Sequence, residues 1–128
     1  MCSATAAGRL TLVFDDTAPG HARTFLRRMH CRAHQTRVLD DALLLVSELV
    51  TNAVRHGAPP ITMHVACDHN TGMTVRVSDT NPAPPTGGTA DHEQESGRGV
   101  GLVDLLSDDW GVEAAEAGKA VWFRLATD

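Results

Sequence analysis

Long apolar runs are missing from this 128-residue sequence, and so is any excess of positive charge. No stretch approaches the roughly 20 apolar residues of a membrane-spanning helix, and the first ten residues hold no apolar segment of a signal peptide. The formal net charge is −5, which argues against general affinity for nucleic acid. We therefore expect a cytoplasmic protein with no membrane segment and no direct contact with nucleic acid.

Cysteine is scarce as well. The three cysteines are widely separated, so they form no metal-binding spacing, and their odd number gives no complete disulfide set. We interpret them as free thiols in a reducing compartment. The chain is long enough to bury one core, and because no linker or repeat divides it, we expect one domain over residues 1–128.

The spacing of apolar residues predicts alternating groups of strands and helices. In chain order we expect a strand at 9–14, helices at 19–34 and 36–56, strands at 61–67 and 73–79, and then a long loop, a short helix and a hairpin. Strands joined by short turns pair antiparallel. The fold class is therefore α/β (α+β), a two-layer sandwich with helices on one face of a mostly antiparallel mixed sheet.

Three polar side chains interrupt the apolar helix predicted over residues 36–56. Glu48, Asn52 and His56 are spaced four residues apart, so they lie along one face, with about 6 Å of helix axis between successive members. A buried carboxylate or amide without a partner is costly, so these residues form either an internal polar network or the wall of a site. In a site, a carboxylate can deprotonate or orient a nucleophile, and an amide oxygen suits Mg²⁺. Gly57 is placed to end the helix in a left-handed conformation.

A fourth polar residue ends the strand predicted over 73–79. Asp79 continues the alternation of Met73, Val75 and Val77, which places its carboxylate on the apolar face. Its role is either to cap a turn or to accept a hydrogen bond from the exocyclic amine of a ligand at the floor of a pocket.

The polar segment at residues 80–98 is rich in proline and glycine, and loops of this length in compact domains are usually functional or disordered. It leads into a small-residue cluster at a predicted helix start, where backbone N–H groups can bind phosphate; the cluster consists of Gly97, Arg98, Gly99, Val100 and Gly101. Arg98 either pairs with phosphate or is solvated. The cluster alone is weak evidence, because it has neither the dinucleotide-binding layout nor the P-loop ending.

Basic residues are concentrated near the N-terminus. Five of the eleven lie within residues 23–37, and no acid lies between His21 and Leu39. This segment is either a solvated helix face or a docking surface for an acidic partner or for a second copy of the chain.

Together these motifs resemble the ATP-binding domain of the GHKL superfamily (gyrase, Hsp90 and histidine-kinase type), most of all its small stand-alone branch with the anti-sigma-factor serine/threonine kinases. SELVTNAVRHG resembles the N box, VRVSDTNP the first glycine box, GRGVGL the second, and GKAVWFRL the last strands. The first glycine box departs from the family pattern Asp-x-Gly-x-Gly, because DTNPA contains no glycine.

The resemblance implies that the cofactors are ATP and Mg²⁺. By this similarity Asn52 would ligate Mg²⁺, Glu48 would act as the base or orient the attacking group, and Asp79 would bind the adenine amine. His56 would line the site. Residues 80–98 would form the ATP lid, and the glycine cluster would contact the phosphates. Ala120 stands where many members have a threonine near the adenine, which would remove one polar contact.

Two functions are compatible with this resemblance. The first is a kinase that phosphorylates a serine or threonine of an antagonist protein, in a system that can include a sigma factor. The alternative is an ATP-responsive protein-binding module with little or no kinase activity. A glutamate at position 48 favours the kinase but does not prove turnover.

Overall fold

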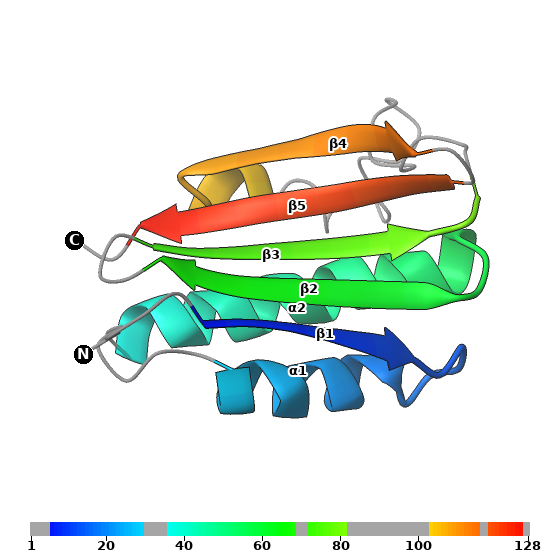
Figure 1. The fold of residues 1–128 in the computed structure, drawn as a ribbon, viewed down its shortest axis with the longest axis horizontal. Helices are drawn as coiled ribbons and strands as arrows, with labels where there is room; N and C mark the ends of the chain where they lie inside the picture. The colour runs from blue at the N-terminus through cyan, green and yellow to red at the C-terminus, as the bar shows by residue number, and fades with distance from the viewer. Residues whose placement is uncertain (1–5, 30–35, 69–71, 82–102, 116–117, 127–128) are drawn as a thin grey trace.

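The computed structural model describes residues 6–29, 36–68, 72–81, 103–115 and 118–126. A helical turn at residues 103–106 precedes β4. Within these ranges the chain forms five strands and two longer helices, shown in Figure 1: β1 (Ala6–Leu12), α1 (Ala18–Met29), α2 (Thr36–His56), β2 (Ile61–Asp68), β3 (Gly72–Asp79), β4 (Asp109–Ala115) and β5 (Gly118–Ala126).

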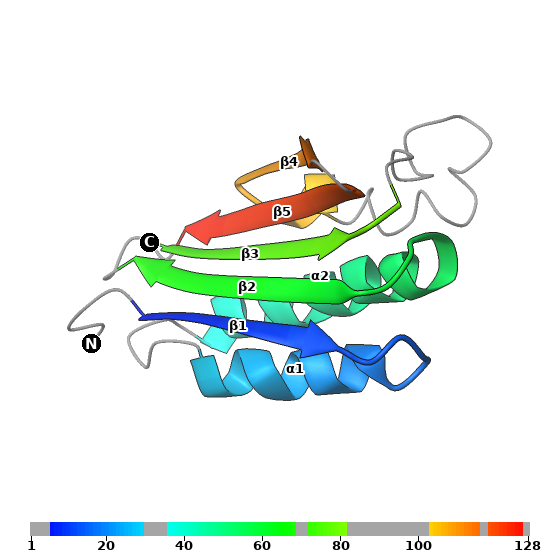
Figure 2. The same ribbon diagram turned by 45° about the vertical axis from the view of Figure 1, so that its right-hand side comes forward.

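The strands form one sheet in the order β1-β2-β3-β5-β4, and both helices cover the same face of it (Figure 1 and Figure 2). The predicted fold class is confirmed. The sheet is more regular than the expected mixed sheet, because all four described pairings are antiparallel. Because two helices connect β1 to β2, the chain reverses direction three times between the strands, and β2 runs antiparallel to β1.

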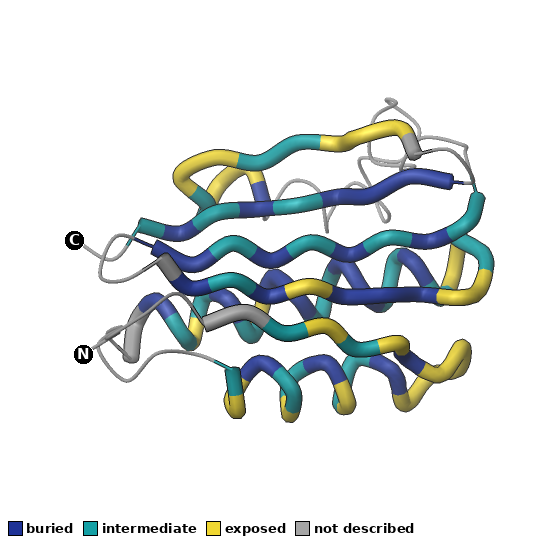
Figure 3. Tube along the Cα trace, in the orientation of Figure 1, coloured by how far each residue is buried: buried dark blue, intermediate teal, exposed yellow. Residues whose placement is uncertain are grey.

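The core lies between the helices and the sheet. Alternate residues of the central strands are buried, as the colouring of Figure 3 shows along β3 and β5. The largest fully buried side chains come from both layers: Phe123, Leu26, Leu45, Ile61, Met63 and Met73. Among the described residues no helix is long and apolar enough to cross a membrane. Cys67 is a buried free thiol, as expected, while Cys2 and Cys31 lie outside the described residues.

The first strand is displaced from its predicted position. It ends at Leu12, and the side chains of Val13 and Phe14 are 48% and 41% exposed, although both were expected in the strand. Leu12 pairs with Ile61, the first residue of β2, and the residue before Ile61 is Pro60. Proline has no N–H to donate, so Pro60 cannot donate a ladder hydrogen bond to a residue that would extend β1 beyond Leu12.

Helix α1 begins in a turn made by Asp15. The Asp15 carboxylate accepts a hydrogen bond from the backbone N–H of Thr17 at 2.8 Å and another from its hydroxyl, and the Ala18 N–H donates to the Asp15 carbonyl at 3.1 Å. These contacts from Thr17 hold the pKa of Asp15 below its usual range. The described helix ends at Met29, and residues 30–34 of the longer predicted helix lie outside the described part.

Candidate functional site

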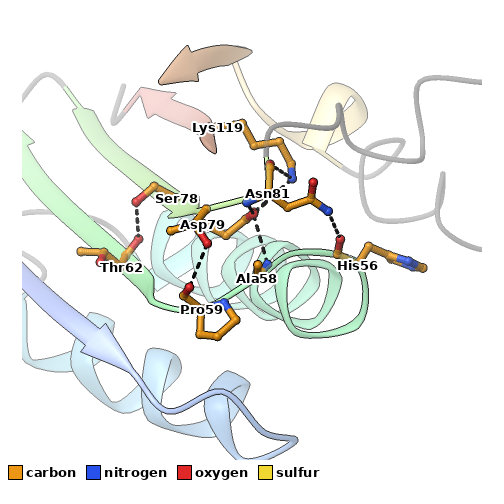
Figure 4. Close-up of polar contacts among 9 residues, drawn as sticks. His56, Ala58, Pro59, Thr62, Ser78, Asp79, Asn81 and Lys119 are labelled. Atoms are coloured by element: carbon orange, nitrogen blue, oxygen red, sulfur yellow. Dashed lines mark hydrogen bonds and ion pairs between the residues drawn. The ribbon is translucent and has the colours of Figure 1, made fainter. Parts of the chain in front are cut away.

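The Asp79 carboxylate is buried at the end of β3, on the helix-covered face, as its strand phase predicted. Its Oδ1 accepts hydrogen bonds from the backbone N–H of Asn81 at 2.7 Å and from that of Ala58 at 3.4 Å. The Lys119 ammonium lies 3.3 Å from Oδ1 and 3.2 Å from Oδ2 (Figure 4). Oδ1 therefore has three donors, whereas Oδ2 has one within the described residues.

The end of α2 is tied to the end of β3 around this carboxylate. The Asn81 side-chain amide donates to the backbone carbonyl of His56 at 2.8 Å, and the Thr80 N–H donates to the carbonyl of Ala58 at 3.0 Å. The Thr80 hydroxyl donates to the carbonyl of Pro59 at 2.8 Å. The carbonyl groups at the end of a helix have no partner within the helix. These bonds supply donors to such carbonyl groups at and just beyond the last turn of α2. They hold the helix end beside Asp79 (Figure 4).

Two glycines make this close approach possible. A Cβ at Gly57 would lie 2.6 Å from both Asp79 Cγ and the Ala53 carbonyl oxygen. A Cβ at Gly118 would lie 1.9 Å from the Asp79 carbonyl oxygen. The prediction that Gly57 takes a left-handed conformation is wrong, because the described glycine with positive φ is Gly118. Gly57 is instead required by its contact with Asp79.

Glu48 and Asn52 lie on α2 as predicted, but both side chains are half-buried rather than enclosed in the core. Within the described residues neither side chain makes a hydrogen bond or an ion pair, so the internal polar network considered above is not present there. The Asn52 amide oxygen is therefore compatible with a ligand role. The described residues hold no group of three or more His, Cys, Asp or Glu that could bind a metal, and an amide oxygen such as that of Asn52 is the kind of ligand that Mg²⁺ takes.

His56 contributes its backbone carbonyl, and not its imidazole, to the contacts around Asp79. Its carbonyl accepts the Asn81 amide, while its imidazole is exposed and points away from Asp79 and Lys119 in Figure 4. The structure thus does not bring the His56 ring to the carboxylate. The cluster of Gly97, Arg98, Gly99, Val100 and Gly101 lies outside the described residues, as does the predicted lid beyond Asn81.

Lys119 is the residue that the sequence reasoning missed. Its side chain is 9% exposed, and its ammonium also donates to the Asn81 carbonyl at 2.9 Å. Val121, Phe123 and Leu125 are buried at alternate positions of β5, and extending that alternation back two residues turns Lys119 inward. The signal that located Asp79 could therefore have located Lys119 as well.

The expected place of Ala120 near the adenine stays a prediction, and the structure places its side chain away from Asp79. In the ladder between β3 and β5, Lys119 pairs with Asp79 and Ala120 pairs with Ser78, so Ala120 faces the opposite side of the sheet. There the ion pair between Arg76 on β3 and Glu113 on β4 spans β5. Lys119 is the β5 side chain that contacts Asp79.

The comparison with known families decides the assignment. Residues 12–125 match the model of the histidine kinase-like ATPase domain. The chain belongs to this family. The family expected from the sequence is thereby confirmed, and Asp79 and α2 lie within the matched region.

Two solved structures resemble this histidine kinase-like ATPase domain. One is the crystal structure of the RsbU and RsbW domains of Rv1364c from Mycobacterium tuberculosis, with a TM-score of 0.71 and 18% identity over 93% of this chain and 32% of that one. The other is the histidine kinase domain of the blue-light activated histidine kinase EL346 from Erythrobacter litoralis, with a TM-score of 0.57 and 16% identity over 88% of this chain and 60% of that one. At these identities the likeness shows a shared fold. No curated protein matches the chain.

Proposed function

We propose that this chain binds ATP with Mg²⁺ and acts as a regulatory serine/threonine kinase of the anti-sigma-factor type, which phosphorylates an antagonist protein. The observation that supports this most is the buried Asp79 carboxylate at the end of β3, inside a histidine kinase-like ATPase domain. A carboxylate accepts hydrogen bonds only, so it favours a base with an exocyclic amine over a base with a carbonyl at that position. Adenine has such an amine.

The proposed adenine contact is made by Oδ2 of Asp79. Oδ1 already has three donors, while Oδ2 has only Lys119 among the described residues and so has capacity for a second donor. A hydrogen bond to a charged group contributes about 1.5–3 kcal/mol, more than a neutral pair. Without this contact, the affinity for ATP would therefore be about tenfold to a hundredfold lower.

Helix α2 would supply the groups for phosphoryl transfer. Asn52 would ligate Mg²⁺, which when bound neutralises negative charge on the phosphates. Glu48, one turn earlier, would take the proton from the attacking hydroxyl of the partner protein. The hydroxyl oxygen forms a bond to the γ-phosphorus as the bond from that phosphorus to the β–γ bridging oxygen breaks, and ADP leaves. The half-buried position of Glu48 supports this role, since the group must be reached by a substrate from solution.

The exposed side of α1 is the proposed contact for an acidic protein partner. Arg27 and Arg28 are exposed, whereas Arg23 is half-buried and donates to the Ser47 hydroxyl at 3.0 Å. Arg23 thus has a structural role between the helices. The charge at the C-terminal end of α1 is the part of the segment that supports docking of an acidic partner or a second copy.

The kinase proposal is tested by comparing wild type with Glu48→Gln and Asn52→Ala in single-turnover assays that contain labelled ATP, Mg²⁺ and candidate antagonist proteins. Glu48→Gln should retain nucleotide and slow transfer by about 10²–10⁴, the scale of a positioned base. Asn52→Ala should weaken Mg²⁺-dependent nucleotide affinity. Transfer by Glu48→Gln at the wild-type rate would remove Glu48 from the chemistry, and ATP binding without transfer by wild type would support the binding module instead.

A further inference from the structure

The Asp79–Lys119 pair is an unusual feature of this core. The Lys119 and Asp79 side chains are 9% and 5% exposed, and they lie on neighbouring strands, at the start of β5 and the end of β3. Removing two charges from water costs free energy that their mutual attraction often fails to recover, so such a pair is a poor way to stabilise a fold. Its position at the candidate base-binding carboxylate indicates a role in the site.

The contacts of Lys119 fix the carboxylate in one orientation. Its ammonium spans both oxygens of Asp79, at 3.3 and 3.2 Å, and is itself anchored by the Asn81 carbonyl at 2.9 Å. The Asn81 and Ala58 N–H groups then bind Oδ1. Oδ1 is thus directed at the protein, and Oδ2 is the oxygen that remains for another donor. A Cβ at Gly57 would lie 2.8 Å from Oδ2, so the absence of a side chain at position 57 allows the end of α2 to pack against this carboxylate.

We propose that Lys119 is a positioning residue that presents Oδ2 of Asp79 to the exocyclic amine of adenine and so determines the preference for adenine over purines with a carbonyl at the same position. Lys119 acts through Asp79 and not through general stabilisation of the domain. The inference rests on the proposed binding of ATP. It predicts an effect confined to nucleotides that have the amine.

The test measures the affinities of wild type and Lys119→Met for ATP and for ITP, whose base has a carbonyl in place of the amine, by calorimetry with Mg²⁺. Methionine retains a long apolar side chain and removes the ammonium. Wild type should prefer ATP by about tenfold to a hundredfold, the range expected for one hydrogen bond to a charged acceptor. Lys119→Met should lose most of this preference, with ATP affinity reduced about tenfold or more and ITP affinity within about twofold of wild type.

Two further variants separate positioning from loss of structure. Arg76→Met removes a cation from the opposite face of the sheet and should leave both affinities unchanged. In the background of Asp79→Asn, Lys119→Met should cause little additional loss of ATP affinity, because residues that act as a unit are not additive. If Lys119→Met fails to fold, Lys119→Gln removes the charge but retains a donor beside Asp79, and it should show a smaller loss of affinity that is still confined to ATP.

The possible outcomes are distinguishable. Equal loss of ATP and ITP affinity in folded Lys119→Met, or an unchanged preference for ATP, would overturn the positioning role while ATP binding by wild type stands. Full additivity with Asp79→Asn would overturn it too. Failure of wild type to bind either nucleotide would instead refute the proposed function, on which this inference rests.

Discussion

Gly57 and Asp79 approach each other so closely that a methyl group between them would overlap with the carboxylate. We predict that Gly57→Ala lowers the free energy of unfolding by about 1–3 kcal/mol, the usual cost of overpacking a filled site, and weakens ATP binding because Asp79 must move. Urea unfolding and calorimetry measure the two effects.

Gly20→Ala is the matched control for that substitution. A Cβ at Gly20 would approach no heavy atom more closely than 3.7 Å, and the residue lies in α1. Replacing glycine by alanine inside a helix stabilises it by up to about 1 kcal/mol. The explanation by close contact would be contradicted if the two variants changed stability in the same direction.

Some residues of the candidate site could be predicted from the sequence, and others could not. Strand alternation placed Asp79 on the buried face, and the same rule applied to β5 would have placed Lys119 there. Motif similarity drew attention to Ala120 rather than to Lys119, and in a strand a shift of one residue reverses the face. The contact of Gly57 with Asp79 joins segments about twenty residues apart in the chain, so no local pattern could predict it.

The two helices are joined by a polar contact within their packed interface. Arg23 on α1 donates to the Ser47 hydroxyl on α2, which donates in turn to the Leu43 carbonyl at 2.8 Å. We predict that Arg23→Met lowers the free energy of unfolding by about 0.5–1.5 kcal/mol through loss of this hydrogen bond. Chemical unfolding followed by circular dichroism measures the change.

Arg28→Met is the control, because Arg28 is exposed on the same helix and its removal should change stability by less than about 0.5 kcal/mol. If α1 docks an acidic partner, Arg28→Met should weaken partner capture while the fold stays intact. Equal stability losses in the two variants would contradict the assignment of Arg23 to the helix interface.

The sequence predicted the type and order of the helices and strands well, but it predicted their first and last residues less well. Helix α2 occupies residues 36–56 as expected, because its apolar spacing is strong and its ends are marked by Thr36 and Gly57. The strand expected at residues 9–14 instead occupies β1 (Ala6–Leu12), since its end is set by pairing with β2 rather than by its own sequence. Local patterns contain no information about where a partner strand begins.

At the scale of the whole molecule, the domain gathers its candidate site at one end of a sheet that has both helices on one face. The end of α2, the end of β3 and the start of β5 meet around the Asp79 carboxylate (Figure 4). The α/β class and the family were both predictable, because they depend on element order and on motifs in fixed succession. The interactions that hold the site together depend on tertiary contacts and needed the structure.

The central claim is that Asp79 binds the amine of ATP, and calorimetric titration of MgATP into wild type and into Asp79→Asn tests it most directly. Asparagine has nearly the same shape as aspartate, and circular dichroism establishes that the variant is folded. The account predicts that wild type binds MgATP and that Asp79→Asn binds it about tenfold to a hundredfold more weakly, through loss of a charged acceptor. No binding by wild type, or equal affinity in the folded Asp79→Asn variant, would contradict the account.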